Sequence, residues 1–195
     1  MPNRLLFLMG VSGSGKTTIM SHILTNTQFA YINSCVTRPM RTGEKQGEKY
    51  DFLTEDEFRA GIAADEFLEY ALVHDRWYYG TKRDRVIKTW EQNKIAIKEL
   101  EILGREKVRH DSFFGPKCRT IFLDIDDTTM TIRMLQRQPD MAMEELESRL
   151  KSAEYERNQA RNLCHYLIDA RQSLEDVKKQ VDHAIHTFMA DPTRG

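Results

Sequence analysis

The stretch FLMGVSGSGKTT, residues 7–18, carries the strongest structural signal in the chain. It satisfies the pattern G-x-x-x-x-G-K-[S/T], in which a glycine-rich loop follows a buried strand and opens a helix. The glycines let backbone N–H groups approach phosphate oxygens, and the helix N-terminus adds partial positive charge. The stretch therefore predicts a nucleoside triphosphate site. The structural alternative is a glycine-rich turn with an incidental lysine.

Two side chains of this loop have chemical roles in the predicted site. Lys16 is expected to bridge the outer phosphates, and the Thr17 hydroxyl is expected to ligate Mg²⁺. The residues expected around the ATP phosphates are Gly10, Ser12, Gly13, Ser14, Gly15, Lys16, Thr17 and Thr18. GTPases, motors and small-molecule kinases share this loop, so the motif alone does not identify the reaction.

Apolar runs resembling the one before the loop recur along the chain, with helical patterns between them. These runs, which indicate strands buried on both faces, are LLFLM (5–9), KIAIKEL (94–100), TIFLDI (120–125) and HYLI (165–168). Helices are expected at about 16–26 and 173–189. The alternation predicts an α/β fold of the P-loop NTPase type, with a parallel sheet flanked by helices.

Two segments interrupt this alternation. Residues 34–93 contain short strands, loops and the helix TEDEFRAGI, where Thr54 and Glu57 form a capping-box pattern. Residues 134–150 have weak apolar periodicity around Pro139. We interpret the first segment as an inserted subdomain and the second as a mobile lid with a helical exit. One domain, 1–195, would then have its core in 1–33, 94–133 and 151–190.

The composition narrows the class of partner. The 195 residues include 29 basic and 30 acidic side chains, a balance that does not favour nucleic acid as a partner. The first apolar run is too short for a signal peptide, and no run approaches membrane-spanning length. The three scattered cysteines, Cys35, Cys118 and Cys164, suit a reducing cytoplasm without a disulfide or zinc framework. We expect a cytoplasmic protein, a monomer or homodimer, that does not bind membranes.

A second stretch, SCVTRPMRTGEKQGEKYDF (34–52), suggests another phosphate site. It places Arg38 and Arg41 three positions apart on a loop stiffened by Pro39. Arginine is the side chain suited to bidentate phosphate binding. Taken alone, these two arginines could equally be solvated surface residues. A chain with two phosphate sites is a candidate for an enzyme that joins the ligand of one site to the ligand of the other.

The motifs that follow the P-loop resemble those of guanylate kinases in identity and order. They are a serine at 34, T-R-P-x-R-x-G-E, Y-x-F, E-F-L-E (66–69) and Y-Y-G-T (78–81). The resemblance extends from Leu5 to about Val181 and is densest over 34–81. It implies a parallel-sheet core, a GMP-binding subdomain at 34–93 and a lid at 134–150. It also implies transfer of the ATP γ-phosphate to GMP or dGMP, with Mg²⁺ as cofactor.

The resemblance assigns roles on the acceptor side of the reaction. The residues matching those that hold the acceptor's monophosphate are Arg38, Arg41, Tyr50 and Tyr79. Those matching the guanine-recognising residues are Ser34, Glu69 and Thr81. One carboxylate can accept both N1–H and N2–H₂ of guanine, and hydroxyls can donate to O6. Outside this context, Glu69 would be interpreted as a surface carboxylate on a strand.

Arginines in the predicted lid match residues that close on the transferring phosphate. These are Arg137 and Arg149, with Arg133 as a nearby competitor for the role. Positive charge at this place stabilises a loose phosphoryl-transfer transition state. No general base is needed, because the acceptor is already an anionic phosphate oxygen. Positioning and electrostatics, with Lys16, can carry the catalysis.

Three departures from the family pattern stand out. Glu101 stands where aspartate is usual and Leu103 where glutamine is usual. Glu99, through water on Mg²⁺, and Glu101, at the guanine edge, can still take part. The lid has Gln138-Pro139-Asp140 in place of a glycine-threonine turn, and LIDARQS (167–173) replaces a V-N-[D/N] segment near the donor base. These changes leave donor-base preference, rate and the choice between GMP and dGMP open.

Two other classes are alternatives. A related P-loop kinase phosphorylates ribose 1,5-bisphosphate, but the arginine–tyrosine loop and the guanine-recognising glutamate are not its pattern. Guanylate-kinase-like scaffold modules bind phosphorylated peptides without catalysis and usually have degraded P-loops, whereas the loop at 10–17 is intact here. ATP turnover with a panel of acceptors separates the three.

Overall fold

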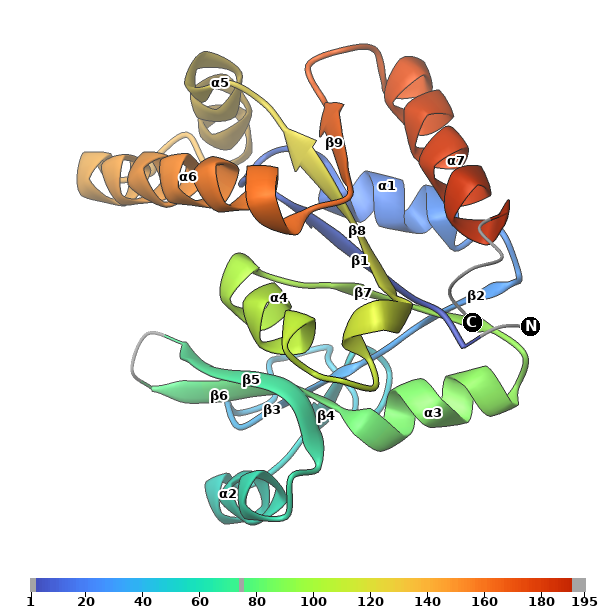
Figure 1. The fold of residues 1–195 in the computed structure, drawn as a ribbon. Coiled ribbons are helices and arrows are strands. Elements are labelled where there is room, and N and C mark those ends of the chain that lie inside the picture. Colours follow the sequence, from blue (N-terminus) through green and yellow to red (C-terminus); the bar gives the residue numbers. More distant parts are fainter. Residues whose placement is uncertain (1–2, 74–75, 191–195) are drawn as a thin grey trace.

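The computed structural model describes residues 3–73 and 76–190, and its centre is a five-stranded parallel sheet (Figure 1). The order across the sheet is β2-β7-β1-β8-β9, and each neighbouring pair is parallel. The strands are β2 (Phe29–Tyr31), β7 (Ile95–Glu99), β1 (Leu5–Gly10), β8 (Cys118–Asp124) and β9 (Tyr166–Asp169). The predicted parallel α/β sheet is thereby confirmed.

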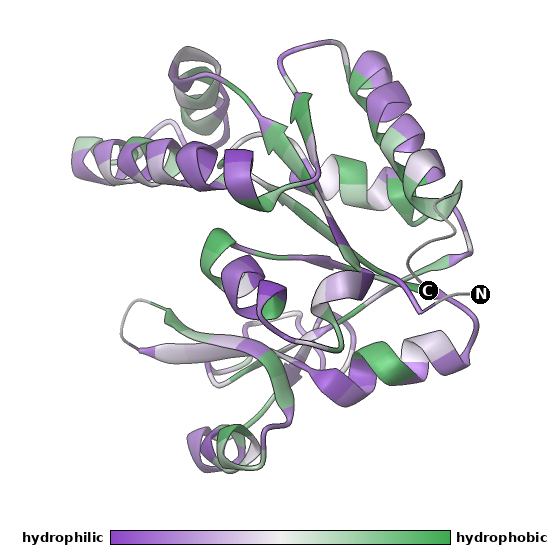
Figure 2. Cartoon of the chain, viewed as in Figure 1, coloured by the Kyte–Doolittle hydropathy of each residue, from purple (hydrophilic) through white to green (hydrophobic). Residues whose placement is uncertain are grey.

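The central strands form because their side chains are apolar on both faces. Residues 5–9 of β1 are at most 1% exposed, and Figure 2 shows hydrophobic strands enclosed by more hydrophilic helices. The four predicted strands are all present, with ends shifted by one or two residues. The edge strand β2 was not predicted, because its three residues are too few for a pattern. It pairs with β7 through Phe29 and Ile95.

Helices lie against this sheet on both sides. Helices α1 (Lys16–Ile23) and α7 (Leu174–Ala190) pack together and against β1, β8 and β9. Helix α3 (Arg83–Glu91) packs on β7, α6 (Met143–Leu163) packs on β8, and α4 (Ile102–Arg109) contacts α6 and β5. A 3-10 turn, η1 (Gly115–Lys117), precedes β8. Helix α1 ends three residues before its predicted end at Asn26, where the chain turns into β2.

A second, smaller sheet has the order β4-β3-β6-β5. Its strands are β3 (Ser34–Val36), β4 (Tyr50–Phe52), β5 (Phe67–Val73) and β6 (Trp77–Lys82), with α2 (Glu55–Ala63) packed beside them (Figure 1). The predicted capping box is present, since Thr54 and Glu57 exchange hydrogen bonds at the start of α2. A separate apolar cluster of Cys35, Phe58 and Phe67 holds this unit together, and Phe58 stacks on Phe67 with centroids 4.2 Å apart.

The segment expected to be a lid consists mostly of helix ends. Helix α5 (Asp127–Arg137) stops at the loop 138–142, which contains Pro139, and α6 begins at Met143. The helical exit is therefore present, and closure of this segment remains a prediction. Within the described residues, no helix has both the length and the apolar character needed to cross a membrane.

Candidate active site

The glycine-rich loop lies between β1 and α1, where the sequence places it. Gly10 has no room for a side chain, since a Cβ there would lie 2.4 Å from the Leu123 carbonyl oxygen of β8. Gly15 caps α1 with φ of 93°, a left-handed conformation that favours glycine. Ser14 is 3% exposed, and within the described part of the chain its hydroxyl has no hydrogen-bond partner. The loop therefore has the close backbone wrap and the spare polar group that a phosphate requires.

Lys16 folds back over its own loop. Its Nζ donates to the carbonyl oxygens of Gly10 at 2.7 Å and Val11 at 3.1 Å. Burial lowers the pKa of Lys16, and the negative charges of Glu156, Glu99 and Glu101 oppose that shift. The amine is thus held at the loop by backbone oxygens, from which it can turn to a phosphate.

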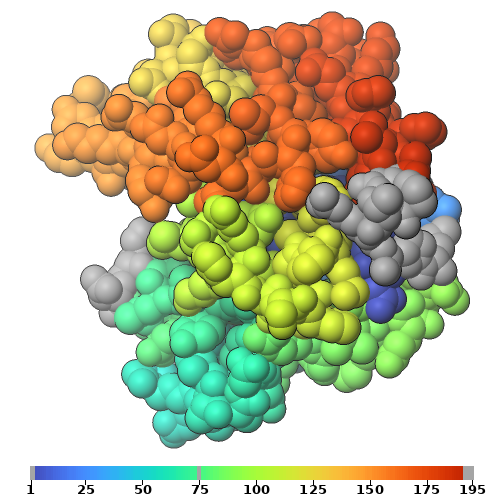
Figure 3. Space-filling view, in the orientation of Figure 1, coloured from blue at the N-terminus to red at the C-terminus, as the bar shows by residue number. Residues whose placement is uncertain are grey.

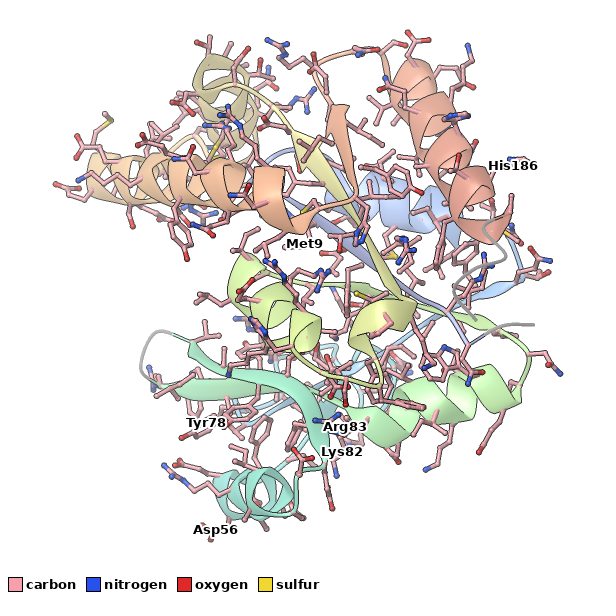
Figure 4. All side chains as sticks on the ribbon, viewed as in Figure 1. Met9, Asp56, Tyr78, Lys82, Arg83 and His186 are labelled. Atoms are coloured by element: carbon pink, nitrogen blue, oxygen red, sulfur yellow. The ribbon has the colours of Figure 1, made fainter. Side chains whose placement is uncertain are left out.

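A cavity opens beside Lys16, between the P-loop, the start of α4 and helix α6. This P-loop cavity is lined by Met9, Gly10, Ser12, Lys16, Leu100, Glu101, Ile102, Phe122, Arg149, Ser152 and Glu156. Figure 3 shows α6 overhanging the lower half of the molecule with a recess beneath it, and Met9, labelled in Figure 4, lies between α6 and α4.

The three arginines of the lid region lie in different surroundings. Arg149 donates to the Ser12 hydroxyl at 3.2 Å and pairs with Glu145 at 2.7 Å, so it belongs to the P-loop cavity. Arg133 donates to the carbonyls of Gly13 and Ala170, both at 3.1 Å, and so holds the loop's backbone. Arg137 is exposed at the end of α5, although its charge acts on Lys16.

Glu156 was missed by the sequence reasoning. It lines the P-loop cavity, accepts a hydrogen bond from Ser152 at 3.0 Å, and interacts electrostatically with Lys16. Burial raises its pKa. Helix α6 carries polar side chains at helical spacing, namely Arg149, Ser152 and Glu156. This polar stripe was the signal in the sequence that could have identified Glu156.

A second cavity, of about 530 Å³, lies between α1, β7 and the small sheet. This small-sheet cavity is lined by several of the predicted acceptor residues, namely Ser34, Tyr50, Glu69, Tyr79 and Glu101, together with Lys16, Thr17, Lys98 and Glu99. Lys16, Leu100 and Glu101 line both cavities. The two cavities therefore meet at Lys16, whereas Arg38 and Arg41 are not among the residues that line either of them.

Glu69 is a buried residue that lines the small-sheet cavity. It is 7% exposed, which rules out the interpretation of a surface carboxylate. Its Oε1 accepts a hydrogen bond from the Thr81 hydroxyl, across the β5–β6 pairing. Burial raises the pKa of Glu69, and the charge of Lys98 and the Thr81 hydrogen bond counter this. Thr81 is 1% exposed and orients the carboxylate, but it is not among the residues that line the cavity.

The two predicted phosphate-binding arginines lie on one loop around Glu44. Arg38 forms a bidentate ion pair with Glu44, with both N–O distances 2.6 Å, and its guanidinium lies 4.9 Å from the Tyr50 ring centroid. Hydrogen bonds with Glu44, which accepts from the guanidinium, and with Tyr79 raise the pKa of Arg38, and the same ion pair lowers the pKa of Glu44 to about 2. Arg41 has an exposed side chain, while its backbone N–H donates to Glu44 at 2.8 Å.

Thr17 and Glu99, the residues predicted near Mg²⁺, and Glu101, predicted at the guanine edge, supply oxygen atoms to the small-sheet cavity. Hard oxygen ligands are those that Mg²⁺ prefers. Within residues 3–73 and 76–190, no three His, Cys, Asp or Glu side chains gather into a metal-binding group. The set therefore fits a cation that takes its remaining ligands from phosphates and water.

The segment that departs from the family pattern after β9 forms a charged cluster. Arg171 pairs with Asp169 at 2.6 Å and Asp126 at 3.2 Å. Arg157 of α6 pairs with Asp124 at 2.9 Å and with Asp127. These side chains line a cavity of about 510 Å³ at the ends of β8 and β9, the place expected for the donor base.

Comparisons with known proteins agree with this geometry. The family model described as guanylate kinase matches residues 2–188. Guanylate kinase of Bacteroides thetaiotaomicron is 32% identical over 191 residues, which is 97% of this chain and 91% of that relative. Guanylate kinase of Helicobacter pylori is 32% identical over 192 residues, 95% of this chain and 90% of that relative. The crystal structure of guanylate kinase from Anaplasma phagocytophilum has the same fold, with a TM-score of 0.73 at 20% identity, covering 99% of this chain and 89% of that one.

Proposed function

This chain belongs to the guanylate kinase family, and on that premise we propose that it transfers the γ-phosphate of ATP to GMP, and to dGMP, giving ADP and GDP or dGDP. The observation that carries the proposal is that the P-loop cavity and the small-sheet cavity share Lys16. A nucleotide in each would bring its phosphates toward one amine. Neither ribose 1,5-bisphosphate phosphorylation nor peptide binding is favoured by the relatives.

On the donor side, the loop residues hold the ATP phosphates. Backbone N–H groups from Gly10 to Thr18 surround them, and Lys16 moves from its two carbonyls to the β- and γ-phosphates. Thr17 and, through water, Glu99 would hold Mg²⁺, which supplies charge neutralisation when bound. Arg149, anchored on Ser12, and the exposed Arg137 add positive charge at the transferred group as the lid closes.

On the acceptor side, Arg38, Arg41, Tyr50 and Tyr79 hold the monophosphate. An oxygen of that phosphate attacks the γ-phosphorus, and the bond to the β–γ bridging oxygen breaks, leaving ADP. No proton needs to be removed from the attacking oxygen, because it is already anionic. Glu69 accepts N1–H and N2–H₂ of guanine, and Glu101 lies near the base edge. Exclusion of water during closure would prevent ATP hydrolysis.

The partners in this proposal are small nucleotides, with no role for nucleic acid or a membrane. Balanced charge supports that choice, with 29 basic and 30 acidic residues. The proposal includes a cytoplasmic location, where the three cysteines remain unpaired, and a monomer or homodimer as the working unit.

The test is ADP release from MgATP with a panel of acceptors. GMP and dGMP are expected to turn over, and AMP, CMP and UMP are expected to be poor, because an adenine or pyrimidine does not match the Glu69 carboxylate. Ribose 1,5-bisphosphate is included for the related kinase. Absence of GMP-dependent turnover would sink the proposal, and faster turnover of another acceptor would reassign the enzyme.

A further inference from the structure

Lys98 is a buried lysine in a strand that is otherwise apolar. It is 2% exposed on β7, opposite Phe7 of β1, and its immediate neighbour on the N-terminal side is the fully buried Ile97. Removing an amine from water costs free energy unless it gains partners. A strand position that served packing alone would be filled by valine, leucine or isoleucine, so the lysine requires an explanation.

The partners of Lys98 place its amine at the guanine end of the acceptor site. Nζ donates to the Ser34 hydroxyl at 2.6 Å and to the Ile32 carbonyl at 3.2 Å. Lys98, Ser34 and Glu69 all line the small-sheet cavity. Burial lowers the pKa of Lys98, and the negative charge of Glu69 opposes that shift and favours the ammonium form. An ammonium has three N–H donors. Two have named acceptors among the described residues, which leaves a donor for a ligand.

Guanine presents an acceptor, O6, next to the donors N1–H and N2–H₂. If Glu69 accepts from the two donors, O6 requires a donor from the protein. Thr81 cannot supply it from its present position, because its hydroxyl already donates to Glu69. Ser34 accepts from Lys98 and can keep its own O–H for a ligand. Lys98 and Ser34 are therefore the donors available beside Glu69.

We propose that Lys98 is a specificity-determining residue, whose amine donates a hydrogen bond to guanine O6 while Glu69 accepts from N1–H and N2–H₂. This rests on the proposed function, since it assumes that guanine occupies the small-sheet cavity. Adenine carries an amino donor in place of O6, so the same amine opposes it. Lys98 and Glu69 thus form a charge-complementary pair that matches the polarity of one base.

The test compares substrates that differ from GMP at one position of the base. GMP and inosine monophosphate both carry O6, whereas 6-thioguanosine monophosphate replaces it with sulfur, a weak acceptor. Lys98→Met removes the donor and keeps the length. We expect kcat/KM to fall about thirtyfold for GMP and for inosine monophosphate, and less than threefold for the thio analogue, since a charge-assisted hydrogen bond is lost in the first two cases alone.

Controls separate recognition from folding. Lys94→Met, at an exposed lysine on the same segment, is expected to leave all three substrates within twofold of wild type. Lys98→Gln retains an N–H₂ donor and is expected to restore part of the preference for GMP over the thio analogue. If Lys98→Met does not fold, the test uses Lys98→Gln together with the wild-type protein. For the wild-type protein, kcat/KM for GMP is expected to exceed that for the thio analogue more than about tenfold.

The outcomes distinguish the two proposals. Equal loss on all three substrates in Lys98→Met would show that Lys98 acts through the structure, and would overturn the inference while leaving the kinase assignment intact. Equal kcat/KM of the wild-type protein for GMP and the thio analogue would also overturn the inference about Lys98. Wild-type protein without GMP-dependent turnover would overturn the function itself.

Discussion

The P-loop cavity and the small-sheet cavity are built in different ways. The phosphate-binding loop of the first is one contiguous stretch, in which Lys16 contacts backbone carbonyls and two glycines permit the close turn. The second collects side chains from β3, β5, β6 and β7 that are already bonded to one another. In the loop around Arg38 and Glu44, too, the side chains are already hydrogen-bonded to one another.

The difference bears on what each region can discriminate. Backbone N–H groups bind phosphates of any nucleotide, so the P-loop cavity supplies charge and position but no choice of base. Partnered side chains in the small-sheet cavity have fixed donor and acceptor directions before a ligand arrives. Substitution in the first region should therefore affect rate, and substitution in the second should affect selectivity.

The largest expected effect is on the first region. Lys16→Ala removes the amine where the two cavities meet, and turnover should fall by about a thousandfold or more, as for the loss of a central electrostatic donor. GMP affinity should stay within about threefold of wild type, because the residues proposed to bind the GMP phosphate and base lie on other segments. Single-turnover kinetics measure the first quantity, and isothermal calorimetry with GMP measures the second.

The control for this variant is Lys45→Ala, at an exposed lysine outside both cavities, which should leave both quantities unchanged. Loss of GMP affinity in folded Lys16→Ala protein would break the comparison. It would mean that Lys16 serves the acceptor as much as the donor.

The next effect tests the second region. Glu69→Gln keeps the size of the side chain but places an N–H₂ donor opposite a guanine donor. We expect kcat/KM for GMP to fall about a hundredfold, which corresponds to roughly 3 kcal/mol. Glu66→Gln is the matched control, since Glu66 is exposed three residues earlier and pairs with Lys82; it should change kcat/KM less than threefold. A similarly small effect at Glu69 would remove the main chemical support for guanine recognition.

The two regions also differed in how far the sequence could predict them. The P-loop, its strand and its helix are local, and they were predicted to within a few residues. Glu69 and Ser34 were found through resemblance, while Lys98 was interpreted merely as part of a strand. That Lys98 faces Ser34 depends on β7 lying beside β1 and on where the small sheet packs, and no local pattern encodes either. The pairing of Arg38 with Glu44 across a glycine turn was likewise beyond local spacing.

A smaller effect is expected at Glu44, which links the backbone and side chains of the acceptor loop. Glu44→Gln removes one charged acceptor from the bidentate pair with Arg38, so the guanidinium is held less firmly over Tyr50. We expect KM for GMP to rise about tenfold, with kcat within twofold, because the loss falls on binding of the monophosphate and not on the transfer step. Glu48→Gln, which affects an exposed pair with Lys45, should change neither. A drop in kcat without a change in KM would show that Glu44 acts on chemistry.

The smallest expected effect concerns pH and sharpens the same contrast. Burial holds the pKa of Glu69 above its ordinary value of 4.5, and guanine recognition requires the ionised form. As the pH falls through that raised pKa, the carboxyl gains a proton and can no longer accept from both guanine donors. The ratio of wild-type to Glu69→Gln kcat/KM should then fall by about twofold at the pH where half of Glu69 is protonated, a pH above 4.5.

The second ionisation of the GMP phosphate, near pH 6, affects both proteins and cancels in the ratio. Turnover of ATP at saturating GMP should change less, because kcat does not depend on the fraction of free enzyme that is competent to bind. A ratio that does not halve until the pH reaches 4.5 would mean that Glu69 titrates as an exposed carboxylate does, and that the small-sheet cavity gains nothing from burying it.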